Sequence, residues 1–478
     1  MYNYNMNKKT LTLLFSFIPL LSLSSCSEKV SYIDLMCGNI NPYTGTYHAC
    51  DKQGNLLSDE KGTIAPFNTS IQLRYYGYGN QDKIYDKELE SDFYSFFKEK
   101  HAYFDRHNYY YSSSDGKVIN NLKTINDSYG SNQEIILEES FYNSLKKALD
   151  FSIHSKDKFN IGIGSLSLLW DAYLDMSSDY TNSSVKDRYL ESSILNRKVM
   201  FDDPLDEEIN FCKDLTLTSQ ELNTYVQLND INKSVIFKNI PRIDEVIKNN
   251  SPLIESLKEK FNIDLSKPSL TLGGFGKGEA TELFKRKYPN KNMFINSGTS
   301  SISCIGSKLT SSKWEFSLSN PLYYQEERVG INYLGGSKYS PSDLVMFKEG
   351  TFSMSTSGSY NAYFYNKDNI IRHHIIDSLT GYSHTYFSSV TVFIEDGSYG
   401  DMITTSLMNT SSLEEANILI GEYKNYLNMD IIPVYLINNS NNTVNCYAPK
   451  EEIKNIKISQ KEYPSYYQKE SVTTIVEL

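Results

Sequence analysis

Four of the six residues from Gly273 to Gly278 are glycine, so most of this segment lacks the Cβ atoms that would keep another group away from the backbone. The apolar stretch 269–272 before this segment predicts a short strand, and the pattern over about 279–287 predicts a helix. Glycine lets a backbone approach a ligand closely, and a helix N-terminus presents unpaired N–H groups to an anion. Lys277 would add a positive charge there. Alone, the segment is also compatible with a plain strand–helix turn, and it matches neither the Walker nor the dinucleotide glycine pattern.

The composition predicts a folded chain that does not bind nucleic acid. Of the 478 residues 40% are hydrophobic, enough to build a core. The formal net charge of −11 disfavours contact with a phosphate backbone. The 38 tyrosines, with runs such as Tyr109–Tyr111, are interpreted as a compositional bias rather than a functional signal.

The N-terminus predicts secretion and a lipid anchor. Lys8 and Lys9 precede an apolar run from Leu11 to Leu23, which has the length of a signal-peptide core and is too short for a transmembrane helix. The run ends Leu-Ser-Ser-Cys, which resembles a bacterial lipobox with lipidation of Cys26. An ordinary signal peptide with a cysteine nearby is the alternative. We therefore expect a soluble body that is lipid-anchored at the extracytoplasmic face of the cell membrane.

Lipidation of Cys26 would leave an odd number of other cysteines at scattered spacing, which is not a disulfide framework. A pair between Cys37 and Cys50 is a hypothesis that the spacing permits. No Cys-x-x-Cys pair or Cys/His cluster predicts a zinc site.

The chain is expected to divide into a signal peptide at 1–25, an irregular polar tether at 26–63, a main domain at 64–450 and a C-terminal tail at 451–478. Hydrophobic spacing predicts helices at 88–103, 138–155, 243–261 and 413–427, the third kinked or divided near Pro252. Strands are predicted at 69–78, 235–237, 292–296, 314–319, 388–394 and 431–437. The spacing of Thr218 and Glu221 is typical of a capping box. This mixture indicates an α+β or α/β fold.

A histidine-containing segment, His-Ile-Ile-Asp-Ser-Leu-Thr-Gly, runs from His374 to Gly381. Histidine is the usual proton carrier near neutral pH, and Asp377 lies close by in the sequence. A histidine with a purely structural role is the alternative.

A third segment, Gly-Asp-Met-Ile-Thr-Thr, runs from Gly400 to Thr405. On a helix Asp401 and Thr405 lie on the same face, because they are four residues apart. A carboxylate and a hydroxyl so placed suit a hard cation such as Mg²⁺. A helix-capping aspartate with a surface threonine is the alternative.

In this order, the three segments resemble the signature of the FAD:protein FMN transferases, the ApbE-type flavin transferases. That signature has Asp-Leu-Gly-Gly-Ile-Ala-Lys-Gly, Asn-x-Gly-Gly, a Trp and Pro seven residues apart, Ser-Gly-Asp/Ser-Tyr, His-Ile-Ile-Asp-Pro-x-Thr-Gly and Ala-Asp-x-x-x-Thr. The matching stretches are 271–278, 296–299, 314–321, 357–360, 374–381 and 400–405. Upstream, 67–69 is similar to a Met-Gly-Thr strand, 119–127 to a Ser-x5-Asn segment, and 159–170 to a Phe-Asp-Pro…Gly…Leu-Trp motif.

The resemblance implies a two-lobed α+β domain of the ApbE type (T-fold-like), with mixed or antiparallel sheets and packed helices. Family members use Mg²⁺ and FAD, transfer FMN to a Ser or Thr of an acceptor protein, and release AMP. It implies Asp401 and Thr405 as Mg²⁺ ligands with the Gly274 carbonyl, and Thr404 as a weaker candidate. His374 is the implied proton acceptor, with Asp377 and Lys277 as further catalytic candidates. The implied FAD contacts are Phe67, Phe104, Phe159, Asn160, Thr271, Lys277, Ser357, Gly358 and Ile376.

Several residues depart from the family pattern. Thr271 and Asn160 stand where the family has carboxylates, and Ser378, Thr299 and Ala362 replace a proline, a glycine and an arginine. We expect a divergent, active transferase. Hydrolysis of FAD to FMN and AMP, or non-catalytic flavin binding by a surface lipoprotein, are the alternatives.

Overall fold

The computed structural model describes residues 29–37, 39–40, 47–48, 58–59, 62–63, 66–112, 115–188, 201–323, 342, 344–441, 443–458 and 473–478. The predicted signal peptide, Cys26 and Cys50 lie outside the described residues. Among the described residues, no helix has both the length and the apolar character needed to cross a membrane.

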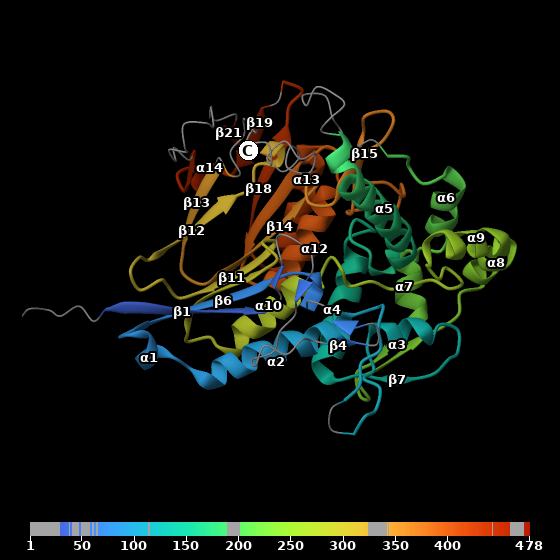
Figure 1. Cartoon of the computed structure of the whole chain (residues 1–478), viewed down its shortest axis with the longest axis horizontal. Helices are drawn as coiled ribbons and strands as arrows, with labels where there is room; N and C mark the ends of the chain where they lie inside the picture. Colours follow the sequence, from blue (N-terminus) through green and yellow to red (C-terminus); the bar gives the residue numbers. More distant parts are fainter. Residues whose placement is uncertain are drawn as a thin grey trace, which may run out of the picture.

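A nine-stranded sheet forms the centre of the molecule (Figure 1). Its strands, in spatial order, are β1 (Val30–Cys37), β6 (Ile71–Tyr78), β10 (Asn292–Ser297), β11 (Ser301–Ile305), β14 (Phe352–Gly358), β17 (Ser389–Ile394), β18 (Ile431–Asn438), β19 (Val444–Ala448) and β21 (Thr473–Glu477). Neighbouring strands are antiparallel except β19 and β21, which are parallel. Every residue of β17 is buried, because Val390 and Val392 pack into one core and Phe393 into another on the opposite face.

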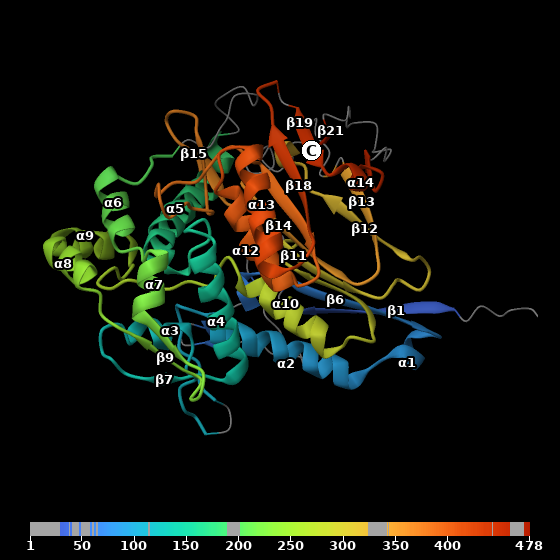
Figure 2. The same cartoon turned by 180° about the vertical axis from the view of Figure 1, so that it is seen from behind.

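Helices cover one face of this sheet. They are α10 (Gly276–Lys287), α12 (Gly397–Met408) and α13 (Leu413–Leu427), with α2 (Lys87–Phe104) alongside α10 (Figure 2). The other face packs on a three-stranded sheet of β12 (Lys313–Leu318), β13 (Leu344–Glu349) and β20 (Ile456–Ile458). Trp314 and Phe316 of β12 fill the core between the two sheets.

A mainly helical lobe lies beside the sheet (Figure 1). It contains α3 (Leu122–Asp127), α4 (Glu139–His154), α5 (Gly164–Arg188), α6 (Asp206–Asp214), α7 (Ser219–Tyr225), α8 (Pro241–Asn249), α9 (Ser251–Phe261) and the small sheet β7 (Ile135–Ile136), β9 (Ser234–Phe237) and β8 (Val226–Asn229). The predicted capping box begins α7: Glu221 N–H donates to Thr218 Oγ1 at 3.2 Å, and Thr218 N–H donates to Glu221 at 3.0 Å. The predicted division near Pro252 separates α8 from α9.

The remaining elements are short. They are α1 (Gln81–Ile84), α14 (Lys450–Ile453), the 3-10 turns Pro66–Asn68 and Ile161–Ile163, the pair β15 (Tyr363–Tyr365) and β16 (Ile371–His373), and the two-residue pairs β2 (Asn39–Ile40) with β3 (Tyr47–His48) and β4 (Ser58–Asp59) with β5 (Gly62–Thr63). Antiparallel sheets with helices packed on them confirm the two-lobed α+β prediction.

Two local expectations were wrong. Residues 269–272 form no strand. Isolated hydrogen bonds hold this segment in place, from Thr271 N–H to Ile161 O at 2.8 Å and from Leu270 N–H to Asn126 Oδ1 at 2.8 Å. Residues 30–37, expected to be irregular, form the edge strand β1, in which Leu35 and Cys37 point inward. The polar composition around this strand concealed its short alternation. The division of the chain into tether, domain and tail stays a prediction.

Candidate active site

The glycine-rich segment lies where α10 begins, against α12. Helix α10 starts at Gly276, earlier than the sequence indicated. A Cβ on Gly278 would lie 2.7 Å from the Gly397 carbonyl oxygen and 2.9 Å from the Asp401 Cγ. Atoms do not pack this closely, so the crossing of the two helices requires glycine at this position. The crossing sets the N–H groups of α10 against the side chains of α12.

Asp401 of α12 accepts hydrogen bonds at the N-terminus of α10. Gly278 N–H donates to its Oδ2 at 2.7 Å, and the Ser301 hydroxyl lies 2.8 and 2.9 Å from its two oxygens. The side chain is 7% exposed. Burial raises the pKa of Asp401, while the Lys277 charge and the hydrogen bonds oppose that rise. The carboxylate thus has hydrogen-bond donors around it but no cation in direct contact among the described residues.

Thr405, one turn after Asp401, also reaches the glycine-rich segment. Its Oγ1 lies 3.3 Å from the point where a Cβ on Gly274 would stand. The three predicted Mg²⁺ ligands, Asp401, Thr405 and Gly274, therefore gather at one place. All their donor atoms are oxygens, which hard cations prefer, so they fit Mg²⁺. Among the described residues no cluster of three or more His, Cys, Asp or Glu could hold a metal, so a cation here would depend on the hydroxyl and the carbonyl.

Lys277, in the first turn of α10, acts electrostatically on both Asp401 and His374. Desolvation by the surrounding protein, with the Lys277 charge, lowers the pKa of His374 to about 4. His374 is nevertheless an exposed residue. His374 is thus neutral near pH 7 and able to accept a proton.

Aromatic side chains line the glycine-rich segment. A Cβ on Gly276 would lie 3.0 Å from Phe104 Cδ2 and 3.3 Å from Phe67 Cε1, and one on Gly274 would lie 3.3 Å from Phe159 Cε2. Phe67 is half-buried, whereas Phe104 and Phe159 are buried. The predicted aromatic contacts therefore surround the same short stretch of backbone.

A family model described as the ApbE family matches residues 67–426. The chain belongs to the ApbE family. This membership confirms the resemblance seen in the sequence, and with it the expected enzyme class of flavin transferases. No curated protein matches the chain.

Solved ApbE structures share the fold. The flavin transferase ApbE from Vibrio cholerae has a TM-score of 0.53 at 14% identity, covering 89% of this chain and 99% of that one. The ApbE protein from Thermotoga maritima has a TM-score of 0.51 at 18% identity, covering 79% and 93%. The apo flavinyl transferase ApbE from Pseudomonas stutzeri has a TM-score of 0.51 at 13% identity, covering 89% and 96%.

Within the ApbE fold of this chain, Asp377 pairs with His384 rather than with His374. His384 Nε2 lies 2.9 Å from Asp377 Oδ2, and Leu379 N–H donates to Oδ1 at 3.0 Å. Burial alone would raise the pKa of Asp377, but these hydrogen bonds lower it overall. Asp377 thus orders the turn that follows His374. Whether it takes part in catalysis stays a prediction.

Other predicted ApbE site residues hold the surrounding segments together. Ser357 donates to Thr404 Oγ1 at 2.9 Å, which ties β14 to α12, and Gly358 follows on the same strand. The Ile376 carbonyl accepts a bond from Asn409 Nδ2 at 3.4 Å, and the same nitrogen donates to Lys158 O at 3.1 Å. Asn409 therefore links the end of α12 to the segments that carry Ile376 and Phe159.

The two residues that replace ApbE carboxylates form hydrogen bonds to nearby backbone groups. Thr271 Oγ1 accepts from Gly273 N–H at 3.3 Å. Asn160 Nδ2 donates to Leu217 O at 2.7 Å, and its Oδ1 accepts from Gly162 N–H at 2.7 Å. These side chains stabilise turns beside the site. Thr299, which stands for a family glycine, has a φ of +59°, a conformation that favours glycine.

Ser301, which donates to Asp401 from β11, was not predicted from the sequence. A serine in a strand is too common a feature to indicate a functional residue, although Ser301 closely follows the Asn-x-Gly-Gly-like segment.

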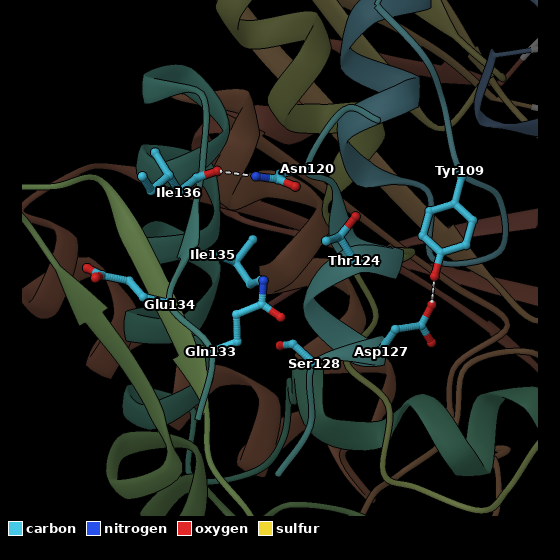
Figure 3. Close-up of a pocket in the computed structure, with 9 residues that line it drawn as sticks. All are labelled: Tyr109, Asn120, Thr124, Asp127, Ser128, Gln133, Glu134, Ile135 and Ile136. Carbon is cyan, nitrogen blue, oxygen red and sulfur yellow. Dashed lines mark hydrogen bonds between the residues drawn. The ribbon is translucent and has the colours of Figure 1, made fainter. Parts of the chain in front are cut away.

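A pocket of about 310 Å³ also lies apart from the predicted site, between α3 and β7 (Figure 3). Its lining includes Tyr109, Asn120 and Asp127 and contains none of the predicted site residues.

Proposed function

We propose that this ApbE-family protein transfers FMN from FAD to a Ser or Thr of an extracytoplasmic acceptor protein, with Mg²⁺, and releases AMP. The observation that carries the proposal is the gathering of Gly274, Asp401 and Thr405 at the N-terminus of α10. The Lys277 charge opposes the rise in the pKa of Asp401 and lowers the pKa of His374. A cation-binding group and a proton acceptor thus lie within the electrostatic reach of one lysine at a helix N-terminus.

The residues present support each part of this reaction. Asp401, Thr405 and the Gly274 carbonyl would hold Mg²⁺, which when bound neutralises charge on the pyrophosphate oxygens. Lys277 and the N–H groups of α10 suit the remaining negative charge. The acceptor hydroxyl oxygen forms a bond to the phosphorus of the FMN half, the bond from that phosphorus to the AMP oxygen breaks, and the hydroxyl proton moves to His374. Neutral imidazole is the form that this last step needs.

Incubation of purified protein with FAD and a flavin-acceptor domain, in Mg²⁺ or in EDTA, tests the proposal. We expect AMP release in Mg²⁺ together with an acceptor mass gain equal to one FMN. AMP and free FMN without acceptor labelling would replace the transferase with an FAD pyrophosphatase. FAD binding without any AMP would contradict both activities and leave a flavin-binding lipoprotein.

We further propose that the protein is anchored to the extracytoplasmic face of the membrane through Cys26. Its support is the apolar run and the Leu-Ser-Ser-Cys sequence. Expression in a lipoprotein-processing bacterium, with metabolic labelling by a radioactive fatty acid, tests this. Label in the parent and not in the Cys26→Ser variant is expected, and equal label in both would contradict it.

A further inference from the structure

A chain of buried hydrogen bonds ends on the backbone of Phe67. Phe67 N–H donates to His101 Nδ1 at 3.0 Å. His101 Nε2 lies 3.1 Å from the Tyr110 hydroxyl, which donates to Asp105 Oδ2 at 2.8 Å. His101 and Tyr110 are each 6% exposed and Asp105 is 8% exposed. Tyr110 is thus one member of the Tyr109–Tyr111 run with a defined internal partner, which a compositional bias would not explain.

The hydrogen-bond partners determine which group donates and which accepts at each step of this series. Because Nδ1 of His101 accepts a backbone N–H, the neutral ring carries its hydrogen on Nε2, as assigned from the bonding pattern. That hydrogen points to the Tyr110 oxygen, and the Tyr110 hydroxyl in turn points to Asp105. The series of donations ends on a carboxylate.

Asp105 is a fixed end point. His107 N–H donates to its Oδ1 at 2.6 Å and Asn108 Nδ2 donates to its Oδ2 at 2.9 Å. Burial alone would raise the pKa of Asp105, but these bonds and the bond from the Tyr110 hydroxyl lower it overall. The carboxylate is ionised at neutral pH and holds Tyr110 in place. Tyr110 in turn orients His101.

The other end of the chain is strained. Phe67 has φ +56° and ψ +23°, and Asn68 follows with φ +52°. Residues other than glycine seldom adopt this left-handed conformation and persist in it only where their surroundings impose it. The bond from Phe67 N–H to the buried His101 is such a constraint.

The imposed conformation sets where the Phe67 ring lies. The ring packs edge-on against His101, with centroids 5.5 Å apart, and lies tilted against Phe104, with centroids 6.2 Å apart. It stands beside Gly276 at the start of α10 and keeps part of its surface open. An aromatic face at this position suits a flat flavin or adenine ring whose pyrophosphate lies at the helix N-terminus.

We propose that His101, Tyr110 and Asp105 are positioning residues that hold Phe67 against bound FAD, without touching FAD themselves. This inference rests on the proposed function only in its assumption that FAD is the ligand. It assigns a role to three residues that carry no part of the family signature seen in the sequence.

The test compares Tyr110→Phe with Tyr111→Phe in the full chain. Tyr111 is the adjacent tyrosine and its side chain is 55% exposed. The Kd for FAD is measured by the change in flavin fluorescence, and kcat for AMP release at saturating FAD. Tyr110→Phe removes the hydrogen bonds to both His101 and Asp105. Because it loosens Phe67 without removing a contact to FAD, we expect it to weaken FAD binding about fivefold, with kcat changed less than about twofold. Tyr111→Phe should leave both unchanged. Equal FAD affinity in the two variants would overturn the proposal, even in a protein that transfers no FMN.

A double-mutant cycle separates positioning from general destabilisation. In a Phe67→Ala background, Tyr110→Phe should no longer change the Kd, because its effect passes through Phe67. A full effect of Tyr110→Phe in that background would overturn the proposal. If Tyr110→Phe folds poorly, Asp105→Asn replaces it, with the same expected loss of affinity and the same disappearance of that loss without Phe67. The parent could bind FAD and yet release no AMP. In that case the proposed transferase would be wrong, while a loss of FAD affinity in Tyr110→Phe that requires Phe67 would still support this inference.

Discussion

Helices α10 and α12 cap each other with buried carboxylates, and the two caps differ in charge balance. At the start of α10, Asp401 of α12 accepts Gly278 N–H at 2.7 Å. At the start of α12, Glu282 of α10 accepts Gly397 N–H at 2.8 Å. Glu282 also contacts Lys285 Nζ at 2.7 Å and Arg286 Nε at 3.0 Å.

The two caps differ in whether the buried carboxylate has a cation in contact with it. Glu282 is 2% exposed and pairs directly with two cations, so its cap is electrostatically complete. Asp401 is 7% exposed and touches a backbone N–H and the Ser301 hydroxyl, with Lys277 acting from farther away. A buried carboxylate without a contacting cation is costly. The Asp401 end therefore suits a bound cation, and the Glu282 end is structural.

The largest expected effect follows from removing the charge at the incomplete cap. Asp401→Asn keeps an acceptor for Gly278 N–H but loses the negative charge. We expect AMP release in Mg²⁺ to fall about 10³-fold, in the range seen when a group that balances developing charge is removed. The free energy of unfolding without Mg²⁺ should stay equal or rise, because an unpaired buried charge has gone. Steady-state assays and urea unfolding measure the two, and a large loss of stability would contradict the comparison.

Glu282→Gln tests the complete cap. Lys285, which is 7% exposed, keeps its hydrogen bonds to Ser353 Oγ and Glu395 O but loses its carboxylate partner, so the free energy of unfolding should fall by about 3 kcal/mol. The concentration of Mg²⁺ that gives half-maximal activity should not change. Glu349→Gln, which removes an exposed partner 4.0 Å from Lys313, is the matched control and should change stability by less than about 0.5 kcal/mol. A changed Mg²⁺ requirement in Glu282→Gln would show that the Glu282 cap affects cation binding at the Asp401 cap, and would contradict the comparison.

Gly278→Ala forces the two helices apart at their crossing. Its Cβ would meet the Gly397 carbonyl oxygen at 2.7 Å, and this atom belongs to the backbone and cannot rotate away. We expect a loss of about 1–3 kcal/mol in unfolding free energy, with weaker Mg²⁺ dependence of activity as Asp401 moves. Gly421→Ala on α13, where an added Cβ meets no atom within 4 Å, is the control and should be neutral or stabilising. Wild-type stability in Gly278→Ala would contradict the close crossing.

The smallest expected effect concerns His373. Like Asp401 it is buried with no opposite charge in contact among the described residues, but unlike Asp401 it can be neutral. Burial lowers its pKa to about 3 from an ordinary value of 6.5. The unfolded chain therefore binds its proton first as the pH falls, so unfolding free energy decreases between about pH 6.5 and pH 3. At pH 5.5 the loss attributable to His373 should be about 1.4 kcal/mol. Urea unfolding at pH 7.5 and 5.5 should show a smaller difference in His373→Gln than in the parent, and equal differences would refute this.

Sequence patterns predicted the local part of the site. Asp401 and Thr405 share a helix face because their spacing matches the helical repeat, and the capping box at Thr218 depends on neighbouring residues. The antiparallel strand order was beyond the sequence, because it depends on pairing between distant segments. The same reason hid the contacts of Ser301 with Asp401 and of Glu282 with Gly397, which join residues more than 95 positions apart.

Calorimetric titration of MgCl₂ into the protein with FAD tests most directly the claim that the Asp401 end needs a cation. We expect one Mg²⁺ to bind to the parent and to Glu282→Gln with similar Kd, and no binding to Asp401→Asn. Equal Mg²⁺ binding to Asp401→Asn, or FMN transfer by the parent that EDTA does not reduce, would contradict the account.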